Sequence, residues 1–105
     1  MDVLQRIQRL VRQGYFQFTL KALDEMSVDG LYPSDVVESI GNARTVTKTL
    51  RSNKPFRLRE KERLYVIESF NNTGTLIYTK GKILREPQGE VFYILVSAKI
   101  STRSG

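Results

Sequence analysis

The chain has no cysteine and no histidine among its 105 residues. Without cysteine it has neither disulfide bonds nor thiolate ligands for a metal ion. Without histidine it lacks the side chain that most often binds zinc and most often acts as a general base near neutral pH. Acid–base chemistry would therefore have to use carboxylates, lysine, tyrosine or arginine. Carboxylates alone can hold magnesium, but no tight acidic cluster falls on one predicted element, and no cofactor is expected.

Long apolar runs are also missing. No stretch approaches the length that is needed to span a bilayer. The N-terminal segment lacks the apolar core of a signal peptide because Arg6, Arg9 and Arg12 interrupt it. We therefore expect a cytoplasmic protein with no membrane partner. The length and the hydrophobic content of 40% are typical of one globular domain, here covering residues 1–105.

Positive charge is concentrated in one stretch. Residues 44–63 contain eight basic and two acidic residues, a net charge of +6 that equals the net charge of the whole chain. The basic residues are Arg44, Lys48, Arg51, Lys54, Arg57, Arg59, Lys61 and Arg63. Such a concentration creates a local positive potential that attracts polyanions such as RNA. A solvated loop, or a loop that meets an acidic protein, stays open as an alternative.

The N-terminal half is predicted to be helical. Asp2 is a suitable cap for a first helix that Gly14 ends, and Thr19 caps a second helix that Gly30 ends. Residues 15–18 are read as a short connector between them. A third, short helix is predicted at residues 35–40.

The remainder is predicted to be a sheet. Residues 45–50 are rich in β-branched side chains, and three further strands are predicted at residues 63–70, 75–84 and 90–100. Turn residues separate the last three strands, and residues 52–61 are read as an exposed basic loop. The tail from Ser101 is expected to fray. The expected fold is α+β: two to three N-terminal helices packed on one face of a twisted antiparallel sheet of about four strands.

Strand alternation predicts two unlike faces for this sheet. The core face of the last strand is expected to hold Phe92, Ile94, Val96, Ala98 and Ile100. The weaker apolar face of the strand before it holds Ile77, Thr79, Gly81 and Ile83.

The predicted turns also set a register between the strands. Turns centred on Asn72-Thr73 and Pro87-Gln88 place Tyr78 opposite Ile67 and Ser97. The same register places Lys80 opposite Tyr65 and Leu95, and Lys82 opposite Arg63 and Tyr93. The exposed face would then gather Arg63, Tyr65, Ser69, Tyr78, Lys80, Lys82, Tyr93, Ser97 and Lys99.

Cations interleaved with tyrosines suit single-stranded RNA, because aromatic rings stack on bases and cations hold phosphates. A solvated sheet face with ordinary Lys–Tyr cross-strand pairs is the alternative. Cleavage by attack of a ribose 2′-hydroxyl would need a base, a proton donor and cations. Lysine and tyrosine are available for the last two roles. The base is left open, because Glu68 is expected to point to the opposite face.

Several segments resemble a known family. The order of elements resembles the RelE-like bacterial toxin superfamily. More closely, the segments IQRLVRQG, TLKALDEM, RLYVIESF, LIYTKGKI and YILVSAK are similar to the MqsR-like branch and its uncharacterised relatives. The likeness runs from about Ile7 to Lys99. Relatives often carry histidine where this chain has Lys21, and lysine is a poor general base near neutral pH.

The resemblance implies a metal-independent endoribonuclease that acts on mRNA and is inhibited by an antitoxin protein. By position, Tyr78 and Lys80 match a Tyr-x-Lys strand pattern near the active site of the MqsR-like branch, and Lys99 matches its final-strand lysine. These three are the catalytic candidates. The RNA-binding candidates are Arg51, Lys54, Arg57, Arg59, Arg63, Tyr65, Lys82 and Tyr93. A non-catalytic RNA-binding or protein-binding module on the same fold is the alternative function.

Overall fold

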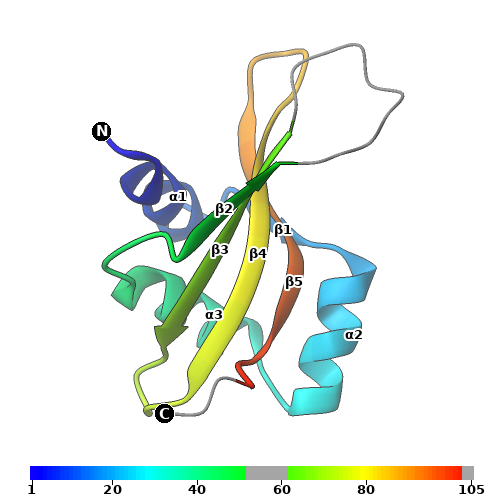
Figure 1. Ribbon diagram of the computed structural model, residues 1–105. Helices are drawn as coiled ribbons and strands as arrows, with labels where there is room; N and C mark the ends of the chain where they lie inside the picture. The colour runs from blue at the N-terminus through cyan, green and yellow to red at the C-terminus, as the bar shows by residue number, and fades with distance from the viewer. Residues whose placement is uncertain (52–61, 103–105) are drawn as a thin grey trace.

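The computed structural model describes residues 1–51 and 62–102 (Figure 1). Its helices are α1 (Val3–Arg12), α2 (Leu20–Asp29) and α3 (Pro33–Asn42). Its strands are β1 (Phe16–Phe18), β2 (Lys48–Arg51), β3 (Arg63–Phe70), β4 (Leu76–Arg85) and β5 (Val91–Ile100). The strands form one sheet in the order β1-β5-β4-β3-β2. The predicted α+β class with N-terminal helices is confirmed, with five strands in place of four.

The helix ends follow the predicted signals. The Asp2 carboxylate accepts a hydrogen bond from the backbone N–H of Gln5, whose side chain accepts one from the backbone N–H of Asp2. The Thr19 hydroxyl accepts a hydrogen bond from the backbone N–H of Ala22 at the start of α2. Gly30 ends α2 in the left-handed conformation, with φ of 69°, which glycine adopts without steric cost.

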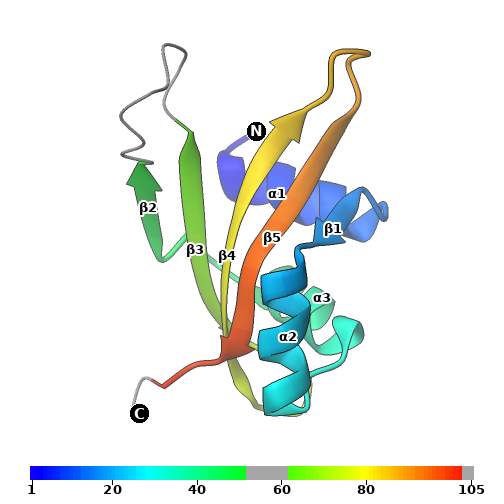
Figure 2. The ribbon, with the colours of Figure 1, turned by 90° about the vertical axis from the view of Figure 1, so that its right-hand side faces the viewer.

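Strand β1 corrects the reading of residues 15–18 as a connector. Phe16, Gln17 and Phe18 pair in parallel with Tyr93, Ile94 and Leu95 of β5 and form an edge of the sheet. All other strand pairs are antiparallel, so the sheet is mixed rather than purely antiparallel. The opposite edge is β2. Helix α2 lies beside β5 (Figure 2), whereas α3 packs against β3 and β4.

One hydrophobic core joins the helices to one face of the sheet. From the helices it takes Ile7, Ala22, Met26, Val36 and Ile40, which are all buried. From the sheet it takes Ile67, Tyr93, Leu95 and Ala98. The other side of the strands is called the open face here, and it carries Val66, Glu68, Tyr78, Lys80, Lys82, Ser97 and Lys99.

The first hairpin differs from the predicted register by one residue. Phe70 pairs with Leu76, so the connection is a five-residue loop, and the Asn71 side chain accepts hydrogen bonds from the backbone N–H groups of Thr73 and Thr75. A one-residue shift moves a whole strand to the other face. Glu68 therefore pairs with Tyr78 on the open face, which corrects its expected position.

The last hairpin contains a β-bulge that the sequence analysis missed. Lys80 pairs with Ser97, whereas Gly81 pairs with Leu95, so Val96 is an extra residue in β5. Alternation therefore changes phase at Val96. Tyr93 and Leu95 before the bulge face the core, whereas Ser97 and Lys99 after it face the open side.

This phase change overturns most of the core face that was predicted for the last strand. Of that predicted set, Ala98 is fully buried, whereas Ile100 is exposed. Phe92, Ile94 and Val96 are only partly buried. The set predicted for the strand before it is confirmed in β4, where Ile77, Thr79 and Gly81 are buried and Ile83 packs against the core.

Candidate functional site

A row of three polar side chains crosses the open face from β3 to β5. Glu68 pairs with Tyr78, and Tyr78 pairs with Lys99, so the three residues lie side by side on neighbouring strands. The Lys99 ammonium nitrogen lies 5.4 Å from the centre of the Tyr78 ring, within the range of a cation–π interaction. A carboxylate, a phenol and an ammonium group are thereby brought onto one surface.

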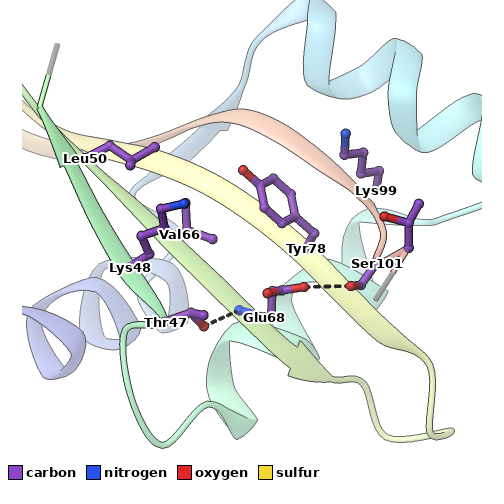
Figure 3. A pocket seen from close by; sticks show the side chains of 9 residues that line it. Thr47, Lys48, Leu50, Val66, Glu68, Tyr78, Lys99 and Ser101 are labelled. Carbon is purple, nitrogen blue, oxygen red and sulfur yellow. Dashed lines mark hydrogen bonds between the residues drawn. The ribbon is translucent and has the colours of Figure 1, made fainter. Parts of the chain in front are cut away.

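This row borders a pocket of about 490 Å³ (Figure 3). The pocket is lined by Thr47, Lys48, Leu50, Val66, Glu68, Tyr78, Lys99, Ser101 and Thr102. Tyr78 stands in the middle of the view, with Lys48 on the β2 side and Lys99 on the β5 side. The volume falls in the range of sites that take a small molecule or one unit of a polymer.

Glu68 is held from two directions. Its backbone N–H donates a hydrogen bond to the Thr47 hydroxyl at 2.9 Å, which links β3 to the segment before β2. Its carboxylate accepts a hydrogen bond from the Ser101 hydroxyl at 2.6 Å, which links it to the residue after β5. Ser101 is itself fixed, because its backbone N–H donates to the Leu76 carbonyl at 2.9 Å. The tail was expected to fray from Ser101, and at Ser101 that expectation is wrong.

A second row lies one step along the strands from the first. Lys48 pairs with Val66, Val66 with Lys80, and Lys80 with Ser97. Two neighbouring rows on one face of a strand are two residues, or about 6.6 Å, apart. Lys99 in the first row and Lys48 and Lys80 in the second therefore lie near Glu68 and Tyr78 on the open face.

The cations of the described residues differ in whether a carboxylate neutralises them. Lys82 forms an ion pair with Glu62 at 3.2 Å, and Lys21 forms one with Glu25 at 3.1 Å. Lys48, Lys80 and Lys99 form no such pair with any described residue. These three lysines therefore carry the positive charge that the open face offers to an anion.

Glu25 fixes the outer edge of β5 beyond the end of β1. Its carboxylate accepts hydrogen bonds from the Ser97 hydroxyl at 2.7 Å and from the backbone N–H of Ala98 at 3.2 Å. Burial acts to raise the pKa of Glu25, but these hydrogen bonds and the nearby Lys21 outweigh it, and the pKa is lowered. The carboxylate thus pairs with a backbone N–H at the edge of β5 that no strand of the described residues covers, beside the bulge after which Lys99 lies on the open face.

Several residues predicted for RNA binding lie elsewhere. Tyr93 is fully buried in the core, where burial raises the pKa of its hydroxyl, so its predicted position on the exposed face is wrong. Tyr65 and Arg63 pair with Gly81 and Arg51 on the helix side of the sheet, which also corrects their predicted face. Lys54, Arg57 and Arg59 lie outside the described residues.

The catalytic candidates are brought together on the open face. Tyr78, Lys80 and Lys99 occupy adjacent positions there, as the alternation predicted, although through different cross-strand partners. Sequence reasoning expected Glu68 on the opposite face and missed Thr47 and Ser101, and it placed Lys48 only in the basic stretch. The Asn71-Asn72-Thr73-Gly74 run also permits a five-residue loop between β3 and β4. A prediction with that loop would have placed Glu68 on the open face.

Two other kinds of feature are absent from the described residues. Among residues 1–51 and 62–102, no three acidic side chains lie close enough together to hold a metal ion. In the same part of the chain no helix is long and apolar enough to cross a membrane.

Comparison of the chain with protein-family models, with curated proteins and with solved structures found no match. The resemblance to RelE-like toxins therefore stays a prediction.

Proposed function

We propose that this protein is a toxin-like, metal-independent endoribonuclease that cleaves single-stranded mRNA at the Glu68–Tyr78–Lys99 row. The observation that carries the proposal is the meeting of a carboxylate, a phenol and two lysines at one pocket on the open face. Neither lysine forms an ion pair with a carboxylate of the described residues. These are the groups that cleavage by an internal ribose hydroxyl requires in a protein without histidine.

The proposed step is a transesterification. The Glu68 carboxylate takes the proton of a ribose 2′-hydroxyl, and the 2′-oxygen attacks the adjacent phosphorus. The bond from phosphorus to the 5′-oxygen breaks, and the Tyr78 hydroxyl donates a proton to that oxygen. Lys99 and Lys48, at the two sides of the pocket, stabilise the extra negative charge of the transition state. The products are a 2′,3′-cyclic phosphate and a free 5′-hydroxyl.

Lys80, a catalytic candidate from the sequence, has an RNA-binding role in this proposal. It lies one row away from Glu68 and Tyr78, in the row that contains Lys48 and Ser97. That position suits a contact with a neighbouring phosphate of the strand rather than with the phosphate that is cleaved. β2 ends at Arg51 and β3 begins at Arg63, and these two arginines pair with each other. Their charge adds to the positive potential that draws RNA towards the sheet.

Cleavage of a labelled RNA by the purified protein in EDTA tests this proposal. Wild type is expected to cut the RNA, and Glu68→Gln is expected to lose about 10²- to 10⁴-fold in rate, the usual contribution of a general base. Glu90→Gln is the matched control, because Glu90 is an exposed carboxylate at the β4–β5 turn, away from the pocket. Equal rates for wild type and Glu68→Gln would reject the assigned base.

A non-catalytic RNA-binding module is the second candidate. The chain has no histidine that could act as a general base, and Lys21 on the α2 surface is engaged in an ion pair with Glu25. Both observations favour binding without catalysis. Binding of RNA without any cut in wild type would select this function. For the toxin proposal the expected partner is an antitoxin protein, and a small reading frame beside the gene whose product blocks cleavage would support it.

A further inference from the structure

We infer that Ser101, the first residue after β5, is a positioning residue that aims the Glu68 carboxylate into the pocket. This inference rests on the proposed function, because it concerns the same site. Its basis is the 2.6 Å hydrogen bond from the Ser101 hydroxyl to one Glu68 carboxylate oxygen. The bond joins a side chain in the middle of the sheet to the C-terminal segment of the chain, 33 residues away.

The C-terminal segment is placed by three backbone contacts. The Ile100 N–H donates to the Asp29 carboxylate at 2.8 Å, and the Ser101 N–H donates to the Leu76 carbonyl at 2.9 Å. Lys99, two residues earlier, pairs with Tyr78. The segment is therefore anchored to α2 on one side and to β4 on the other, and Ser101 projects from it over β3.

The side chain of a glutamate on a strand can adopt several rotamers, and restricting it to one of them costs conformational entropy. In this site Thr47 fixes the Glu68 backbone and Ser101 fixes one carboxylate oxygen. Together these two bonds favour one orientation of the carboxylate group at the wall of the pocket, beside Tyr78. Pre-ordering of this kind contributes to rate rather than to affinity, because it brings the base into the geometry of the reaction.

The first test separates positioning from binding. In steady-state cleavage of a single-stranded RNA, Ser101→Ala is expected to lower kcat by roughly 10- to 100-fold with KM nearly unchanged. Ser101→Thr keeps the hydroxyl and is expected to restore most of the rate. Ser27→Ala, at an exposed position of α2 far from the pocket, is the matched control and should behave like wild type.

A spectroscopic measurement accompanies the kinetics. The carbon-13 chemical shift of the Glu68 carboxyl group is expected to move in Ser101→Ala and to return in Ser101→Thr at the same pH. If Ser101→Ala cleaves like wild type while Glu68→Gln is inactive, the positioning role is wrong and the proposed function stands. If wild type cleaves no RNA, the proposed function fails, and the positioning role fails with it.

Discussion

Tyr78 and Lys99 lie directly opposite each other on β4 and β5, and the Lys99 ammonium group sits 5.4 Å from the centre of the Tyr78 ring. The pair exists because a bulge at Val96 changes the phase of β5. Without that extra residue, regular alternation would place Lys99 on the same side as Tyr93, towards the helices. A single backbone irregularity thus places the lysine at the pocket.

Substitutions of Tyr78 should separate its ring from its hydroxyl. Tyr78→Phe keeps the ring and the cation–π contact with Lys99, so RNA affinity should be close to that of wild type. The loss of the hydroxyl should lower the cleavage rate by about 10²- to 10⁴-fold, as expected for a proton donor. Tyr78→Ala should in addition weaken binding by about 1–3 kcal/mol if a base stacks on the ring. Fluorescence anisotropy and cleavage rates check these outcomes, and full cleavage by Tyr78→Phe would remove the hydroxyl from the mechanism.

The three open-face lysines that pair with no described carboxylate should set the salt dependence of RNA binding. Lys48→Met, Lys80→Met and Lys99→Met should each weaken binding and lower the slope of log affinity against log salt by about one. Arg6→Gln removes one positive charge from the exposed surface of α1 and is the control for net charge. Titrations of a fluorescent RNA at several salt concentrations provide the slopes. Equal slopes for Lys80→Met and Arg6→Gln would place the RNA elsewhere.

Gly81 should tolerate no side chain. A Cβ atom at this position would lie 2.5 Å from the Cζ atom of the Tyr93 ring, and Tyr93 is fully buried. Gly81→Ala is therefore expected to destabilise the fold by about 1–3 kcal/mol, as overpacking of a core does. Gly41→Ala in α3 meets no atom within 4 Å and should stabilise the protein by up to about 1 kcal/mol. Urea denaturation of both variants gives the two free energies of unfolding, and an unchanged value for Gly81→Ala would contradict the packing.

Glu25 should contribute to stability in a pH-dependent way. Its pKa is lower in the folded protein than its ordinary value near 4.5, so its contribution is complete above that value and is lost as the pH falls through the folded pKa. The difference in unfolding free energy between wild type and Glu25→Gln should therefore be largest near neutral pH and shrink below about pH 4.5. Asp24→Asn removes the same charge from the next exposed position on α2 and is the control. A difference that is constant from pH 3 to pH 7 would show that the hydrogen bonds to Ser97 and Ala98 do not depend on the ionised form.

Local signals predicted much of this fold. Asp2, Thr19 and Gly30 mark helix ends because capping depends on side chains next to the helix. The predicted strand at residues 63–70 is found at those residues as β3. Tyr78 and Lys80 could be placed on one exposed face because β-alternation within β4 is regular. Lys99 was also placed there correctly, because it follows the bulge at Val96 and alternation from Ser97 onwards is undisturbed.

Long-range pairing could not be predicted in the same way. β1 has three residues and exists because it pairs with β5, more than 70 positions away in the sequence. Glu68 was placed on the wrong face because the Asn71 side chain replaces backbone contacts in a wider loop. Tyr93 was wrongly predicted to lie on the surface because the bulge at Val96 was not foreseen. The bulge depends on contacts with Glu25 and β4, and contacts between distant residues cannot be read from local propensity.

In the proposed reaction the Glu68–Tyr78–Lys99 row activates a ribose 2′-hydroxyl. The most direct measurement compares an all-RNA oligonucleotide with one that carries a single 2′-O-methyl group at the position of cleavage, both in EDTA. Wild type is expected to cut the first and leave 2′,3′-cyclic phosphate ends, and to bind the second equally well without cutting it. Cleavage of the methylated oligonucleotide at that position, or binding of both without any cut, would rule out this role of the row.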